Sequence, residues 1–93
     1  MKMKSELDRN RVVVKDLNQQ VNILIAEVLQ IPIKEIEDKL EMDQVDAWDS
    51  LKHMELIIML EGHFGIQLTF EEIVRMRSVE KVKHVLIEKG ALS

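Results

Sequence analysis

The chain of 93 residues contains no cysteine and no tyrosine, and it has only one proline and three glycines. The absence of cysteine excludes a disulfide framework, a thiolate metal site and thiol chemistry carried by the protein itself. We therefore expect neither secretion nor redox function, and a cytoplasmic location. No apolar run approaches the roughly 20 residues that a membrane span needs, and residues 1–11 are charged rather than a signal peptide. We expect no membrane binding.

The apolar content of 46% is enough for a chain of this length to fold as one small globule. We divide the sequence into a flexible N-terminal arm over residues 1–14, a single domain over 15–89 and a short tail over 90–93, and we expect a monomer. No set of His, Asp and Glu residues has the spacing of a metal site. The sequence therefore predicts a domain that folds without a bound metal.

Charge is distributed unevenly. Residues 1–15 hold five Lys or Arg against two acids, whereas residues 35–55 hold eight acids against two lysines. An acidic middle segment would repel a phosphate backbone, so we expect no nucleic-acid surface there. It favours basic partner surfaces, and a plainly solvated acidic face explains the run equally well.

The apolar spacing predicts helices and no strand. A first amphipathic helix is expected from about Asp16 to Leu29, with Pro32 ending it. The stretch 30–48 is then a long connection, with room for a short helical turn over 32–36.

Three further helices follow from their end signals. Asp49 is expected to cap a helix that runs to about Phe64 and is closed by Gly65. Thr69 opens a short helix with a capping box, and Ser78 caps a last one. We predict an all-α fold, a small four-helix bundle with a long first connection and a short third helix.

One hydroxyl stands out in this arrangement. In the run Trp48-Asp49-Ser50-Leu51, Ser50 is placed at the start of a helix, where first-turn amides and the helix dipole favour an anion. No histidine and carboxylate form an obvious relay with it, no G-x-S-x-G elbow surrounds it, and no oxyanion hole is evident, which disfavours a hydrolase. We interpret Ser50 as a modified residue suited to a phosphodiester. The simpler alternative is an ordinary helix start.

The second predicted helix carries two apolar stripes, although only one can face a small core. His53, Leu56, Ile57, Leu60 and Phe64 form one stripe. Leu51, Met54 and Ile58 form the other, flanked by Glu55 and Glu61. We interpret the second stripe as a partner-docking patch. The alternative is that the 30–48 connection covers it.

These features together resemble the acyl carrier proteins of the phosphopantetheine-binding carrier family. The resemblance rests on D-S-L at a helix start, Met54-Glu55-Leu56-Ile57, Leu60-Glu61, Phe64-Gly65-Ile66 and the two capped helices that follow, and it covers residues 15–89. It implies that Ser50 receives 4′-phosphopantetheine from coenzyme A through a phosphopantetheinyl transferase. The thiol of that arm would then hold an acyl or aminoacyl group as a thioester, in fatty acid or polyketide biosynthesis.

The resemblance also implies roles for single residues. Asp49 and Leu51 would flank the attachment site, and partner enzymes, namely ligases, acyltransferases or synthases, would contact the docking residues. Those residues are Leu51, Met54, Glu55, Ile58 and Glu61. A cargo pocket would lie near His53, Leu60, Ile73 and Met76, although bulky side chains there equally describe a closed core.

Four residues depart from the family pattern. Lys52 stands where fatty-acid carriers usually have an acid, and Trp48 fills a position that is commonly small. Gly62 and His63 interrupt the usual acidic end of the second helix. A carrier specialised for dedicated enzymes is therefore plausible, and Trp48 is either a loop anchor or a cargo contact. We expect no enzymatic activity. The alternative function is an unmodified helical interaction or regulatory module that binds a partner through the exposed stripe of the second helix.

Overall fold

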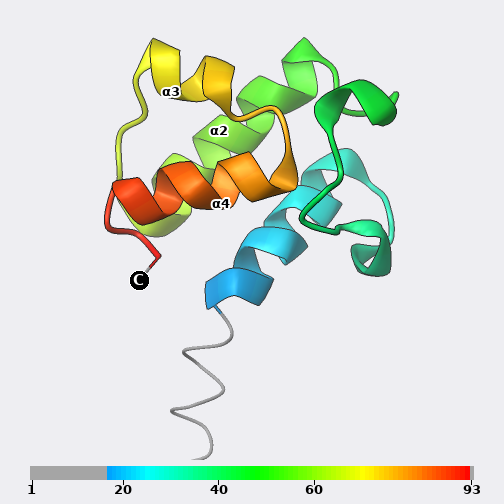
Figure 1. Ribbon diagram of the computed structural model, residues 1–93, viewed down its shortest axis with the longest axis horizontal. Coiled ribbons are helices and arrows are strands. Elements are labelled where there is room, and N and C mark those ends of the chain that lie inside the picture. The colour runs from blue at the N-terminus through cyan, green and yellow to red at the C-terminus, as the bar shows by residue number, and fades with distance from the viewer. Residues whose placement is uncertain (1–16, 93) are drawn as a thin grey trace, which may run out of the picture.

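Figure 1 shows the computed structural model, which describes residues 17–92. Over this range the chain is helical and has no strand, apart from one isolated bridge between Glu41 and Ser78. The helices are a first helix (residues 17–29), α2 (Ser50–Phe64), α3 (Phe70–Arg75) and α4 (Val79–Glu88). The predicted four-helix fold with a long first connection is confirmed. None of the helices within residues 17–92 combines the length and apolarity that crossing a bilayer requires.

The start of the first helix at Asp16 and the arm over residues 1–14 lie outside the described residues. Its end is described, and it falls at Leu29 as predicted. Gln30 takes a left-handed conformation with φ of 58°, and the N–H of Ile31 donates to the carbonyl of Ala26 at 3.2 Å. This is the bond pattern of a Schellman motif, with glutamine where glycine is usual. The chain has therefore left the helix before Pro32.

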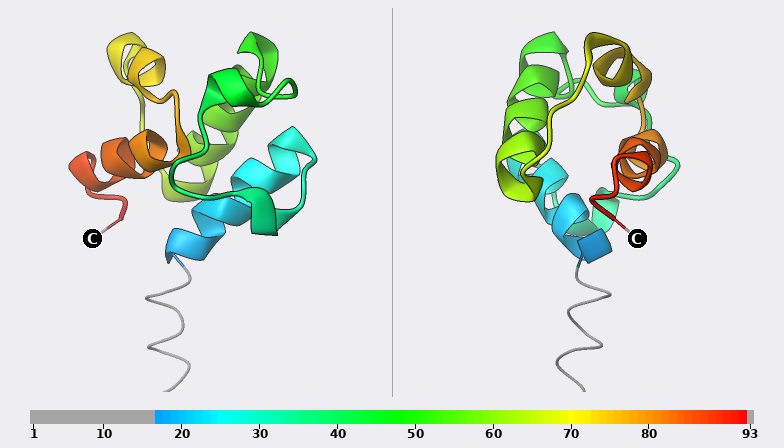
Figure 2. Two further views of the ribbon diagram at one scale, coloured as in Figure 1. Left: turned by 45° about the vertical axis from the view of Figure 1, so that its right-hand side comes forward. Right: turned by 90° about the vertical axis from the view of Figure 1, so that its left-hand side faces the viewer.

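The helices surround one apolar core, and the right-hand view of Figure 2 shows α2 and α4 on opposite sides of it. The core draws on the first helix, α2, α4 and the long connection, whereas α3 has no buried residue and adds only the partly buried Ile73 and, just after its end, Met76. Its fully buried side chains include Val21, Ile25, Leu29, Trp48, Leu56, Ile57, Leu60, Met76, Val79, Val82, Val85 and Leu86. His53, Leu56, Ile57 and Leu60 of the first α2 stripe are thus buried where their spacing predicted, whereas Phe64 is only partly buried.

The long connection is ordered by the start of α4. It contains two short 3-10 turns, η1 (Ile33–Glu35) and η2 (Met42–Gln44). The first two amides of α4 donate to this connection, from Val79 to the Leu40 carbonyl at 3.0 Å and from Glu80 to the Asp38 carbonyl at 2.9 Å. The first amides of a helix have no partner within the helix, so the connection satisfies donors that would otherwise need water.

Candidate functional site

Ser50 is the first residue of α2, and its side chain is exposed. The preceding residue, Asp49, has extended backbone angles, and its Oδ1 accepts a hydrogen bond from the backbone N–H of Lys52 at 2.9 Å. The predicted cap is confirmed. Within the described part of the chain, the amides of Ser50 and Leu51 make no hydrogen bond. The hydroxyl therefore stands beside unused donors at the positive end of a helix, which suits an attached phosphodiester.

A buried pair of rings supports this helix start from below. Trp48 is 2% exposed and His53 is 7% exposed. The indole Nε1–H of Trp48 donates to Nδ1 of His53 at 3.0 Å, and Nε2 of His53 lies 2.9 Å from the carbonyl oxygen of Ile73. An indole N–H can only donate, so Nδ1 must be the acceptor and the imidazole is the neutral tautomer with its proton on Nε2. His53 thus joins the end of the connection, α2 and α3.

This arrangement decides the role of Trp48 and excludes His53 as a base for Ser50. Because its ring is buried and hydrogen-bonded, Trp48 serves as the loop anchor. Because both ring nitrogens of His53 already have partners, that histidine has no free nitrogen with which to take a proton from Ser50. Among the described residues, no group of three His, Asp or Glu side chains is placed to hold a metal ion.

The second apolar stripe of α2 is open to solvent. Leu51, Met54 and Ile58 are 69%, 45% and 64% exposed, respectively. The alternative that the connection covers this stripe is therefore wrong. Glu55 lies beside the stripe and pairs with Lys52, with 3.3 Å between Nζ and Oε1.

Glu61 differs from the other expected docking residues. It is half-buried, and its Oε2 accepts a hydrogen bond from the backbone N–H of Leu68 at 2.9 Å. The carboxylate therefore holds the loop between α2 and α3, a contact that sequence spacing does not reveal.

The residues expected around a cargo pocket separate into two groups. Leu60 and Met76 are fully buried in the closed core. His53 and Ile73 instead line an open hollow of about 190 Å³ beside Ser50. The other residues of this hollow are Met54, which the sequence indicated only as a docking residue, and three residues that it did not indicate, Met42, Val74 and Arg77. They meet there only because α3 and η2 fold against the start of α2.

Comparison with known proteins identifies what such a site holds. Residues 19–86 match the family described as "Phosphopantetheine attachment site". The chain is 29% identical over 72 residues to "Polyketide-8 synthase acyl carrier protein 2" of Streptomyces avermitilis, covering 76% of this chain and 82% of that protein. It is 31% identical over 75 residues to an "Acyl carrier protein" of Petrotoga mobilis, covering 80% and 87%, respectively.

The described site fits the prosthetic group that the family carries, 4′-phosphopantetheine. Ser50 offers an exposed hydroxyl, the amides of Ser50 and Leu51 offer free donors for a phosphodiester, and the adjoining hollow leaves space beside that hydroxyl. Members of this family are non-catalytic carriers. They work with a phosphopantetheinyl transferase and with enzymes that act on the carried group. This chain belongs to the phosphopantetheine-attachment family of acyl carrier proteins.

Proposed function

We propose that Ser50 is the attachment residue and that the chain carries an acyl or aminoacyl group for partner enzymes. The observation that carries this proposal is the position of Ser50: exposed, first in α2, and next to two amides without partners in the described structure. The arm supplies the thiol that a chain without cysteine lacks.

In the attachment reaction Ser50 supplies the attacking oxygen, and the transferase supplies the base. A bond forms between Ser50 Oγ and the phosphorus next to pantetheine in coenzyme A, the bond from that phosphorus to adenosine bisphosphate breaks, and the hydroxyl proton leaves. Because His53 has both ring nitrogens engaged, the base for that proton belongs to the transferase. Asp49 holds the first turn in place, and the free amides of Ser50 and Leu51 face the charge that the product carries.

We also propose that partner enzymes dock on the exposed stripe of Leu51, Met54 and Ile58, with Glu55 at its edge. An exposed apolar patch with an acidic rim suits a partner with apolar residues surrounded by basic ones. An unmodified interaction module would use the same stripe but would give Ser50 no role. The cytoplasmic location and the monomeric state stay predictions.

Intact mass spectrometry tests the attachment. Incubation with coenzyme A and a broad-specificity phosphopantetheinyl transferase should add one phosphopantetheine to the wild type and none to Ser50→Ala. Trypsin cleaves after Lys39 and Lys52, and the peptide 40–52 contains Ser50 but no other hydroxyl residue. The added mass should be found in that peptide.

The variant should keep the fold, because removing one exposed hydroxyl changes stability by less than about 0.5 kcal/mol. Circular dichroism melts provide this control. A wild type that never gains the mass, or a Ser50→Ala variant that still gains it, would contradict the carrier proposal and favour the interaction module.

A further inference from the structure

The hollow beside Ser50 adjoins a second, larger depression. This α3–α4 groove has a volume of about 440 Å³ and is lined by residues from the end of α3, from the connection that follows it and from α4. Val74 and Arg77 line both cavities. The two cavities therefore meet at these two residues, which a group attached at Ser50 would have to cross to reach the second.

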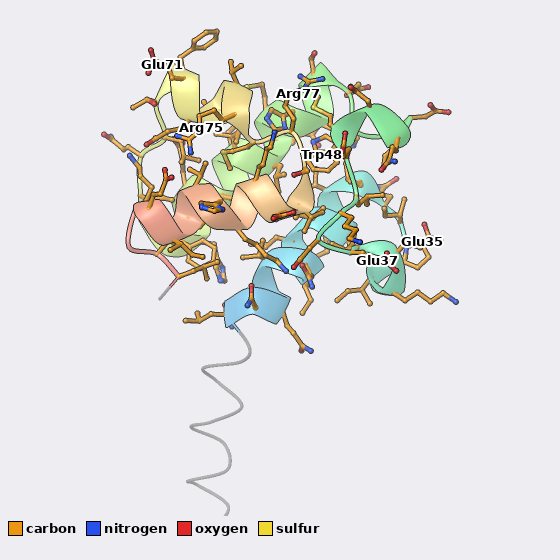
Figure 3. All side chains as sticks on the ribbon, viewed as in Figure 1. Glu35, Glu37, Trp48, Glu71, Arg75 and Arg77 are labelled. Carbon is orange, nitrogen blue, oxygen red and sulfur yellow. The ribbon has the colours of Figure 1, made fainter. Side chains whose placement is uncertain are left out.

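The walls of the groove are unusually basic for this chain. Arg75, Arg77 and Lys81 line it, against one carboxylate, that of Glu88. These are three of the eight Lys and Arg residues between positions 17 and 92, in a protein with a formal net charge of −4. Figure 3 shows Arg75 between the ribbons of α3 and α4 and Arg77 further along, toward the connection that precedes α2.

The cations of the groove are available to a new anion. Arg75 pairs with Glu88 at 3.1 Å and Arg77 pairs with Asp43 at 2.8 Å, and all four side chains are about half exposed or more. Exposed ion pairs contribute little, so exchanging one carboxylate for another is nearly neutral. Lys81 forms no ion pair with any other residue of the described range.

The groove also has apolar surface. Val74, which is half exposed, supplies it, whereas Val85 lines the wall from a fully buried position. By contrast, the core between the helices is closed, since Leu60 and Met76 have no exposed surface. The open spaces near Ser50 are therefore the hollow and the groove, where a short methylene segment ending in an anion would meet Val74 and the cations.

We propose that the α3–α4 groove binds the free carboxylate of a carried dicarboxylic acyl group, with Arg77 at the entrance and Lys81 and Arg75 inside. The proposal rests on the attachment of the arm to Ser50 and deepens it by naming a cargo class: a short acyl chain with an acid at its far end. The phosphodiester is also an anion, so the test must separate it from the carboxylate.

Nuclear magnetic resonance of the ¹⁵N-labelled protein makes that separation. Ser50 is loaded with hydrolysis-stable coenzyme A analogues in which an amide replaces the thioester, bearing succinyl, butyryl or no acyl group. All three carry the phosphodiester, and succinyl and butyryl have the same number of carbons. We expect succinyl alone to shift the amide signals of Val74, Arg77, Lys81, His84 and Val85.

A pair of charge-reversed variants tests the groove directly. Lys81→Glu places an acid at the third position of α4, where helices accept it, and it keeps the backbone N–H bond to Ser78 Oγ. We expect it to reduce the succinyl-specific shifts several-fold. Lys34→Glu is the matched control, because Lys34 is exposed in η1 and does not line the groove. It should leave the shifts unchanged.

Intact mass, measured on the same samples, reports the attachment independently of the shifts. Three results, each obtained with full loading, would overturn the groove proposal and leave the carrier function standing. They are equal shifts from succinyl and butyryl, shifts at Leu60 and Met76 instead of the groove, and equal effects of the two variants. Absence of any mass gain would overturn both.

Discussion

The indole N–H of Trp48 donates to Nδ1 of His53 at 3.0 Å in a nearly solvent-free position, directly beneath the helix start that presents Ser50. The second ring nitrogen of His53 meets the carbonyl of Ile73 at 2.9 Å. One imidazole therefore connects the residue before Asp49 with the third helix. The position of Ser50 and the shape of the hollow beside it both depend on this contact.

Trp48→Phe should destabilise the fold. The phenyl ring cannot donate, so Nδ1 of the buried His53 loses its partner, which costs about 1–3 kcal/mol in addition to the lost volume. Urea unfolding followed by circular dichroism measures this. His84→Ala, at an exposed histidine, is the control and should change stability by less than about 0.5 kcal/mol. Equal effects of the two variants would show that the hydrogen bond from the Trp48 indole contributes nothing to stability. In a separate measurement, the ¹⁵N chemical shifts of the wild-type His53 ring should report a proton on Nε2 only.

The two stripes of α2 should respond differently to truncation. Met54→Ala removes a side chain that is 45% exposed and should leave the melting temperature nearly unchanged while slowing loading by a partner enzyme. Leu60→Ala opens a cavity in the core and should cost about 2–5 kcal/mol. Should Met54→Ala unfold the protein as readily as Leu60→Ala, then Met54 belongs to the core and the docking face is wrong.

Charge at the edge of the stripe should act on the rate of association. Glu55→Lys should slow docking of a basic partner enzyme, most strongly at low salt, because exposed charges mainly affect the encounter. The matched control is Glu37→Lys, an exposed acid in the connection near η1, which Figure 3 labels. Stopped-flow loading rates as a function of salt measure the effect. The same slowing in both variants would indicate a general effect of net charge.

The capping box of α3 should make stability depend on pH. The backbone N–H of Thr69 donates to Oε1 of Glu72 at 2.9 Å, and Lys89 Nζ lies 3.0 Å from the same oxygen. These contacts, the backbone bond first, hold the pKa of Glu72 below its ordinary value. Because the pKa is lowered in the folded state, the stabilisation is present above the ordinary pKa and is lost as pH falls through the folded one.

Glu72→Gln keeps an acceptor for Thr69 but removes the charge. The variant should be less stable than the wild type near pH 7, and the difference should shrink as the pH falls through the folded-state pKa of Glu72, below which the carboxyl is protonated in both the folded and unfolded wild type. Urea unfolding at several pH values measures this. Glu71→Gln, at the exposed neighbouring acid, is the control and should show a smaller pH dependence. If the difference in stability between Glu72→Gln and the wild type stays constant with pH, the loss of stability comes from the shape of the side chain rather than from its charge.

The helices and their ends could be predicted from the sequence because their signals act within one turn. Asp49 and Thr69 cap helices through bonds to the residue three positions later, and Gly65 closes α2 in a left-handed conformation. The two stripes of α2 follow from its period, and the start of that helix places Ser50 at its exposed first turn. The resemblance to carrier proteins used the same local features.

The surroundings of Ser50 could be known only from the tertiary structure, because they are made by residues far apart in the chain. Arg77 comes to the hollow from 27 positions away, and His53 reaches the carbonyl of Ile73 across 20 positions. No local pattern distinguished the closed core at Leu60 from an open pocket, since an apolar stripe of one helix fits either. Whether that stripe meets a filled or an empty space depends on how the opposite helices pack, and this packing also created the basic groove beside the site.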